Sequence, residues 1–204
     1  MELILGEPAE QITKLQFLAV SLLNLAQSTR RTYECLFVSK FNETSMMHLS
    51  HYLVGWFFYT SINLMPLLSY HPDLSSVSDS NEDSVKSPSI RLVLAFVVYF
   101  WSSLDQYRNH KHLAQLVKYN RPQQGLFKYV CCAHYFDEIM VYFSYALIVG
   151  TKFSVLILVW VIVDLAVSAN ETYKFYVLQE LKVDEKKGKD SNAPSFGRIV
   201  PFVY

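Results

Sequence analysis

Five long apolar runs, separated by short polar stretches, decide what this chain can fold into. They lie at about residues 12–28, 46–69, 90–107, 135–150 and 153–169. Lipid offers no partner for backbone polar groups, so runs of this length are expected to be helices. Any one run could also be a buried helix of a large soluble core, but five in 204 residues favour the membrane. We therefore predict an all-α fold, a polytopic membrane helix bundle with about five transmembrane helices.

The polar stretches predict how these helices are oriented. Residues 29–45, residues 108–128 and the tail from residue 170 carry most of the lysines and arginines, whereas residues 71–89 hold four acids and one lysine. Five alternating crossings put the three basic stretches on one side and the acidic stretch on the other. Basic stretches mark the cytosolic side of a membrane protein. We therefore predict cytosolic basic loops, a cytosolic C-terminal tail and a flexible loop at 71–89 on the opposite side.

Short local patterns refine this topology. Only Thr151 and Lys152 separate the last two apolar runs, so these runs are expected to form a tight helical hairpin. Asn42 and Asn170 each begin an N-glycosylation pattern, but both would face the cytosol and are expected to stay unmodified. The opening residues are acidic and lack a basic region, so no cleavable signal peptide is expected.

The cysteines, histidines and glycines argue against several classes of site. The three cysteines form no CxxC pair, so neither a disulfide scaffold nor a structural zinc site is expected. Of the six histidines, only His48 with His51 and His110 with His112 are closely spaced, so we predict no metal site and expect His48 to bond a neighbouring helix. No GxGxxG, P-loop, GxSxG or HExxH motif occurs. Membrane helices and their loops would have to hold any nucleotide cofactor, and no nucleic-acid partner is expected.

Charged and polar residues gather at the predicted cytosolic ends of two runs. Arg30, Arg31 and Glu34 follow the first run directly and would form i,i+4 and i,i+3 pairs on a helix. They are either an interfacial salt bridge that fixes helix depth or a site for an anion or polar headgroup. Residues 101–112 include Ser102, Asp105, Gln106 and two histidines. This stretch is too polar to face lipid, so we expect it to line a cavity.

Several motifs together resemble the steroid 5α-reductase family, and within it the polyprenol reductase branch. They are RRTYECLFVS at 30–39, MMHLSHYLVG at 46–55, WSSLDQY at 101–107, RPQQGLFKYV at 121–130, AHYFDEI at 133–139, YKFY at 173–176 and RIVPFVY at 198–204. The resemblance covers the chain from about residue 15 onward. It implies that residues 1–204 are one membrane-embedded C-terminal domain of a family whose members usually have six to seven transmembrane helices, one or two of them before residue 12.

The resemblance also implies a function. Such enzymes are multi-pass proteins of the endoplasmic-reticulum membrane that bind NADPH from the cytosol. The implied reaction is reduction of the α-isoprene double bond of polyprenol or polyprenal, which leads to dolichol for protein N-glycosylation. The partners would then be a polyprenyl lipid substrate and membrane lipid. Positions that match the family's cofactor pocket, or an arginine near it, are Arg31, Gln106, His110, Tyr119, His134, Glu138, Tyr176 and Arg198. His134 stands where the family usually has asparagine, and Arg198 is shifted from the family's terminal arginine.

Hydride addition to a double bond needs an acceptor for the developing negative charge. An α,β-unsaturated aldehyde provides one at its oxygen and an allylic alcohol does not, so the chemistry favours polyprenal as substrate. Candidates to donate a hydrogen bond to that oxygen are Tyr33, Glu34 and His110. The aromatic-rich residues 55–64 are a plausible wall for the polyprenyl tail. Alternatives are a trans-2-enoyl-CoA or sterol reductase of the same family, and a membrane partner without catalytic activity.

Overall fold

A computed structural model describes residues 12–40, 49–70, 90–116, 120–187 and 197–199 of the chain. Its elements are α1 (Lys14–Tyr33), the π-helix η1 (Glu34–Val38), α2 (Leu49–Ser69), α4 (Ile90–Gln115), the short 3₁₀ helix η2 (Gly125–Lys128), α5 (Ala133–Val149) and α6 (Lys152–Lys187). Several expectations concern residues outside the described ranges: the opening residues, the N-glycosylation pattern at Asn42, the contact of His48, the loop at 71–89 and the place of Tyr119.

The predicted all-α fold is confirmed over this part of the chain. Each of the five apolar runs forms a helix, and the β-structure described is limited to one isolated bridge between Val130 and Gly197. Three helices run well past the ends of their apolar runs: α1 to Tyr33, α4 to Gln115 and α6 to Lys187. No glycine or proline interrupts these continuations, and polar residues such as Arg, Gln and Lys are good helix formers.

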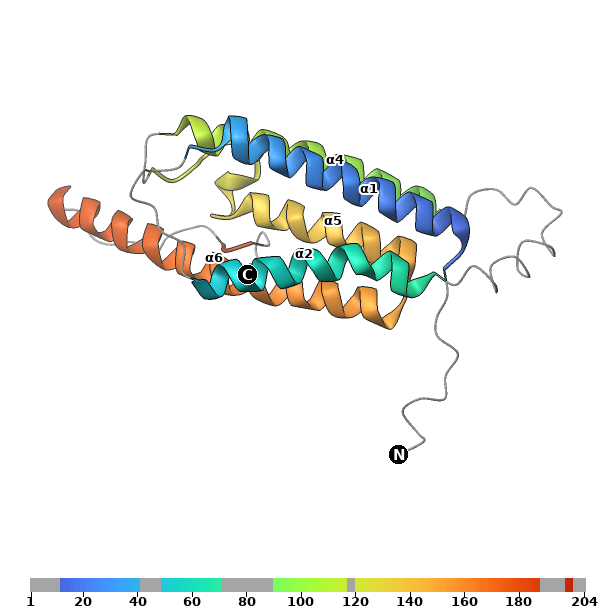
Figure 1. Cartoon of the computed structure of the whole chain (residues 1–204). Coiled ribbons are helices and arrows are strands. Elements are labelled where there is room, and N and C mark those ends of the chain that lie inside the picture. The colour runs from blue at the N-terminus through green and yellow to red at the C-terminus, as the bar shows by residue number, and fades with distance from the viewer. Residues whose placement is uncertain (1–11, 41–48, 71–89, 117–119, 188–196, 200–204) are drawn as a thin grey trace.

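Helix α5 is the centre of the bundle. It packs against α4, α6 and α1, while α2 contacts α1 and α6. Figure 1 shows α5 between α1 and α4 on one side and α2 and α6 on the other, with the far half of α6 projecting beyond the bundle. The core draws on all five helices and includes Val20, Met65, Ala95, Tyr145 and Ile157, each 7% exposed or less.

The predicted hairpin between α5 and α6 is confirmed. Gly150 caps α5 in the left-handed conformation with φ of 70°, and α6 begins two residues later. A Cβ atom at Gly150 would lie 2.0 Å from the guanidinium of Arg91, whose Nε donates to the carbonyl of Leu147. Arg91 thus brings a positive charge to the C-terminus of α5, where the helix dipole favours it.

The outer surface of the bundle is rich in large apolar side chains. Leu25, Trp56, Phe57, Leu104 and Leu156 are each more than half exposed. Among the described residues, one helix has the length and composition to cross a membrane: residues 152–180 of α6, whose apolar 18-residue window has a mean hydropathy of 2.1.

At one end of the bundle, residues 197–199 lie against the segment before α5. The backbone amides of Cys131 and Cys132 donate to the carbonyls of Gly197 and Arg198 at 3.0 and 3.1 Å, and the amide of Gly197 donates to Tyr129 at 2.7 Å. A small apolar cluster around Cys131, Cys132 and Ile199 covers this junction. This region forms a compact cap at the polar end of the helices.

Candidate active site

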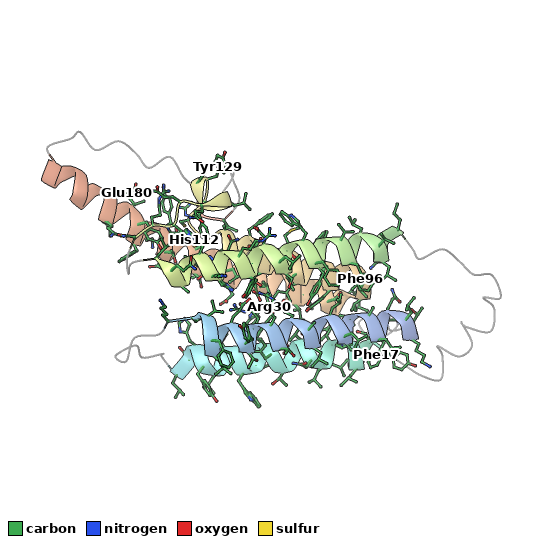
Figure 2. All side chains as sticks on the ribbon, turned by 90° about the horizontal axis from the view of Figure 1, so that it is seen from above. Phe17, Arg30, Phe96, His112, Tyr129 and Glu180 are labelled. Carbon is green, nitrogen blue, oxygen red and sulfur yellow. The ribbon has the colours of Figure 1, made fainter. Side chains whose placement is uncertain are left out.

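A cavity of about 260 Å³ lies between the helices, and all five of them contribute to its wall. The lining residues are Arg31 from α1; His51, Val54, Gly55, Phe58 and Tyr59 from α2; Gln106 and His110 from α4; His134, Tyr135, Glu138 and Tyr142 from α5; and Trp160, Val161, Asp164 and Leu165 from α6. Figure 2 shows Arg30 between α1 and α4, displaced from Phe17 and Phe96 toward the end of the bundle marked by His112 and Tyr129. The expectation that the polar stretch 101–112 lines a cavity is confirmed at Gln106 and His110.

Glu34 is the electrostatic centre beside this cavity. Its side chain is fully buried and accepts hydrogen bonds from Arg30, from Arg31 at 2.7 Å and from Nδ1 of His110 at 2.7 Å. Burial alone would raise its pKa, but the bond from His110 and the charges of Arg30 and Arg31 lower the pKa to about 2. Glu34 is therefore ionised. It does not line the cavity itself and instead fixes two residues that do, Arg31 and His110.

The backbone changes form at Glu34. The α-helix α1 ends at Tyr33, and the amide of Ser39 donates to the carbonyl of Glu34 at 2.8 Å, the i→i+5 bond of a π-helix. Single π-helical turns within helices occur frequently at functional sites. Here the turn begins three residues after Arg31, so the charged cluster lies at the change of helix type.

Gln106 connects three helices beside the cavity. Its side-chain oxygen accepts from Nε2 of Gln27 at 3.3 Å and from Arg30, both on α1. Its amide nitrogen donates to the carboxylate of Glu138 and to the carbonyl of His134 at 3.4 Å, both on α5. The side chain is only 1% exposed, and such fully bonded buried polar groups hold neighbouring helices in one arrangement.

His134 presents an unused polar atom in the same place. Its Nδ1 atom is buried without a hydrogen-bond partner in the described structure. Burial first, and then electrostatic interaction with His110 and Arg31, lower its pKa to about 3, so the His134 ring is neutral at physiological pH. A buried nitrogen without a partner costs free energy, and a ligand in the cavity could bond it.

The structure brings together five of the site residues named from the sequence: Arg31, Gln106, His110, His134 and Glu138. Tyr33 is half exposed, does not line the cavity and packs its ring against Phe37 at 5.2 Å. Tyr176 and Arg198 also lie away from the cavity wall. Tyr176 packs against the cluster around Cys131 and Cys132, and Arg198 stacks over the ring of Tyr173 and donates to Asn170 at 3.0 Å. The aromatic-rich residues 55–64 contribute Gly55, Phe58 and Tyr59 to the wall, as expected.

Four polar lining residues were missed by sequence reasoning: His51, Tyr135, Tyr142 and Asp164. Asp164 carried a usable signal, because it is the one charged residue within the apolar run 153–169, and an acid in such a run is rarely without a role. The tyrosines carried none, since the chain has fourteen and only packing shows which face a cavity.

The cavity combines a cation, imidazole rings, two carboxylates and phenolic hydroxyls. Such a set can hold an anionic or amide-bearing ligand and can place hydrogen-bond donors at a reacting oxygen. Among the described residues, no group of three or more His, Cys, Asp and Glu side chains is placed to hold a metal ion. The donors and acceptors that line the cavity suit acid–base and hydrogen-bonding chemistry around a bound organic ligand.

Comparison with known proteins identifies relatives along most of the chain. A sequence model of the family described as 3-oxo-5-alpha-steroid 4-dehydrogenase matches residues 46–187. A polyprenal reductase of Saccharomyces cerevisiae is 38% identical over 86% of this chain and 60% of its own length. Polyprenal reductases of Xenopus tropicalis and Mus musculus are 33% and 29% identical over 78% and 83% of this chain. The chain spans just over half the length of these two relatives, 54% of each.

The match includes every helix from α2 to α6, and with them fifteen of the sixteen residues that line the cavity, all but Arg31. The chain therefore belongs to the 3-oxo-5-alpha-steroid 4-dehydrogenase family, the steroid 5α-reductases, and within it to the polyprenal reductase branch.

Proposed function

We propose that this protein reduces the α-isoprene double bond of polyprenal with NADPH, a step toward dolichol. The observation that carries the proposal is that polar and apolar side chains line the same cavity. Arg31, His110, His134 and Glu138 lie there together with apolar and aromatic residues of α2 and α6. A polar pocket end beside an apolar wall suits a lipid with a small reactive head. The polyprenal reductases to which the chain is similar support the same assignment.

The lining residues fit a nicotinamide cofactor. Glu138 offers a carboxylate that can accept from a carboxamide, and His134 offers a buried Nδ1 atom without a described partner. Arg31 and His110 give this end of the cavity donors for phosphate or ribose oxygens, and arginine is well suited to bind phosphate. The basic stretch 108–128 could meet the additional phosphate that distinguishes NADPH from NADH. When bound, the cofactor supplies a hydride to the β-carbon of the enal.

The residues of the chain then have to manage negative charge at the aldehyde oxygen. As hydride arrives at the β-carbon, the double-bond electrons move toward the oxygen, and a proton is finally taken up at the α-carbon. A hydrogen-bond donor aimed at the oxygen lowers the barrier by about 3 kcal/mol. His110 lines the cavity and stays a candidate donor, and Tyr59 and Tyr142 have the geometry that Tyr33 lacks, because their side chains form the wall.

Glu34 acts as a positioning residue in this scheme. Its carboxylate holds Arg31 and His110 from outside the cavity, at 2.7 Å each. The two residues are thereby kept in one orientation before any ligand binds. Preorganised donors of this kind avoid a reorganisation cost during the reaction.

We also propose that residues 1–204 form one membrane-embedded domain in the endoplasmic reticulum. The five helices would cross the bilayer with the cavity end and the C-terminal tail toward the cytosol, where NADPH is available. The apolar side chains on the outside of the bundle and the basic composition of residues 108–128 support this placement. About 20 helical residues span the apolar core of a bilayer, and α1 and α2 have 20 and 21.

The proposal is tested by expressing the chain in a host that lacks its own polyprenal reductase. Microsomes should oxidise NADPH only when polyprenal is added, and the saturated aldehyde should appear in equal amount. Polyprenol, a trans-2-enoyl-CoA and a 3-oxo-4-ene steroid are run beside it. Turnover of one of these instead of polyprenal would reassign the substrate, and no turnover at all would favour a membrane partner without catalytic activity.

A further inference from the structure

A second hollow lies on the outer surface of the bundle, between α2 and α6. It is a groove of about 130 Å³ lined by Phe57, Phe58, Ser61, Phe153, Leu156, Ile157 and Trp160. Its one polar side chain, Ser61, already donates its hydroxyl to the carbonyl of Phe57 at 2.9 Å. The groove therefore offers a ligand only apolar and aromatic surface.

The groove adjoins the cavity. Phe58 and Trp160 line both of them, so these two side chains lie between the polar site and the outer surface. The ring of Phe57 lies 6.1 Å from that of Trp160 and extends the aromatic wall outward. Phe57, Leu156 and Trp160 are 58%, 65% and 44% exposed, so the outer edge of the groove is open.

The size of the cavity requires such an opening. Its volume of about 260 Å³ lies below the roughly 300–1,000 Å³ usual for sites that enclose a drug-sized ligand. Under the proposed function it would have to hold the reactive end of the cofactor and the first isoprene unit. No space is left for the remaining isoprene units, so the tail has to leave the cavity.

The polarity of the surrounding side chains favours one direction for the tail over the other. A hydrocarbon chain is costly to place beside the polar part of the cavity wall, which includes Arg31, His51 and His110. Contact with Phe58, Trp160 and Leu156 removes apolar surface from water or lipid headgroups at about 25 cal/mol per Å². The apolar groove is the favourable path.

We propose that the groove between α2 and α6 is the subsite for the second and following isoprene units, through which the polyprenyl tail leaves the cavity past Phe58 and Trp160 toward the bilayer. This inference rests on the proposed function and adds to it the route of the substrate's tail. It also explains why a long lipid can react in a small polar site: only its head enters.

Filling the groove tests the inference. Ser61→Phe adds a ring to the groove, and Thr60→Phe adds the same ring one residue away, outside it. The pair is matched, because both hydroxyls bond the carbonyl four residues earlier, at 2.9 and 2.8 Å. Each variant and the wild type are assayed with a one-isoprene enal, which the cavity alone would hold, and with long-chain polyprenal.

Ser61→Phe should lower kcat/KM for long-chain polyprenal at least about tenfold, since overfilling a packed site costs about 1–3 kcal/mol. Turnover of the one-isoprene enal should stay within about twofold, which also shows that the variant is folded. Thr60→Phe should leave both substrates within about twofold. An equal loss on both substrates, or no loss on the long one, would overturn the inference.

The same experiment separates this inference from the proposed function. Wild-type protein that reduces neither enal contradicts the function, and the tail route with it. Wild-type protein that reduces both enals while Ser61→Phe still accepts the long one keeps the function and removes only the groove. An independent readout is a polyprenyl analogue with a photoreactive group on its third isoprene unit, which should label α2 or α6 near Phe57 and Leu156. Labelling elsewhere in the chain counts against the route.

Discussion

Glu34 carries more of the site's electrostatics than any other single residue described. Its buried carboxylate is the common acceptor for Arg30, Arg31 and His110. Removing one partner from a buried charged group leaves the others without compensation, which costs more than the pair contributes when intact. The three donors also differ in role, because Arg31 and His110 line the cavity and Arg30 turns to Gln106.

We therefore expect Glu34→Gln to lower the free energy of unfolding by about 2 kcal/mol, within the usual cost of unpaired buried polar groups. It should also raise the KM for NADPH several-fold, because Arg31 and His110 lose their anchor. Thermal melting and initial-rate kinetics in the same detergent measure both effects.

Glu171→Gln is the matched control. Glu171 pairs with Lys174 at 2.8 Å, again over three residues, but both side chains are more than half exposed. Exposed pairs contribute about 0–1 kcal/mol, so this variant should leave stability and kinetics nearly unchanged. Equal behaviour of the two variants would contradict the role assigned to Glu34.

The pH dependence of stability separates two buried groups. His134 has a pKa of about 3 in the folded protein, below its ordinary 6.5, because burial disfavours its charged form. Between those values the unfolded chain binds more protons, so His134 makes stability fall as pH falls from about 6.5. Glu34 has a pKa of about 2 against an ordinary 4.5, so the stability that it contributes is lost only as pH falls below about 4.5.

We expect His134→Asn to flatten the melting temperature between pH 6.5 and 5 relative to wild type. Each fully displaced proton changes the slope by about 1.4 kcal/mol per pH unit. Glu34→Gln should leave this window as in wild type and reduce the loss below pH 4.5. Identical curves for His134→Asn and wild type above pH 5 would show that the folded ring is charged.

At the scale of elements, the sequence predicted where the helices lie in the chain better than it predicted which side of each helix faces the cavity. Apolar runs of membrane length predicted all five helices, because lipid and core both select such runs. The C-terminal ends of α1, α4 and α6 were predicted too early, since charged residues such as Arg30 continue a helix as well as they end an apolar run. The π-turn at Glu34 was not predicted, because no residue type in 34–38 marks such a turn.

The site, too, was predicted only in part. Motif resemblance named five residues that the structure brings to one cavity: Arg31, Gln106, His110, His134 and Glu138. Which tyrosines face that cavity depends on how the helices are rotated about their axes. Rotation is set by contacts between helices far apart in sequence, such as the bond from Tyr99 to the carbonyl of Leu23, and no local pattern encodes it.

The hairpin between α5 and α6 gives a prediction at this scale. Gly150→Ala should destabilise the fold twice: alanine is strained at φ of 70°, and its Cβ would displace the guanidinium of Arg91. Gly125→Ala is the control, because Gly125 has φ of 57° but a Cβ there meets nothing within 4 Å. The backbone cost is about 1–2 kcal/mol in each variant, so the melting temperature should fall further for Gly150→Ala. Equal shifts would mean that Arg91 does not hold the end of α5.

At the scale of the whole molecule, polar and apolar surfaces are divided along the helix axes. The charged cluster, the cap formed by residues 197–199 and the projecting part of α6 lie toward one end of the bundle, while apolar side chains cover its flanks. This division suits a bundle that stands in a membrane with its site at one interface. It also explains how a cofactor from water and a substrate from lipid could reach one cavity from different directions.

This arrangement predicts a definite topology. Glycosylation acceptors inserted at 71–89 should be modified, whereas acceptors inserted near Gln123 or after Lys187 should not, because the latter two would face the cytosol. The natural pattern at Asn170 should stay unmodified as well, since Asn170 lies within α6 and accepts a hydrogen bond from Arg198 at 3.0 Å. Mobility shifts on glycosidase treatment of each variant give the answer. Modification near Gln123 without modification at 71–89 would invert the bundle and put the cavity on the side of the membrane without NADPH. Modification near Gln123 but not after Lys187 would mean that α5 and α6 do not cross as a hairpin, which would remove the shared wall on which the site depends.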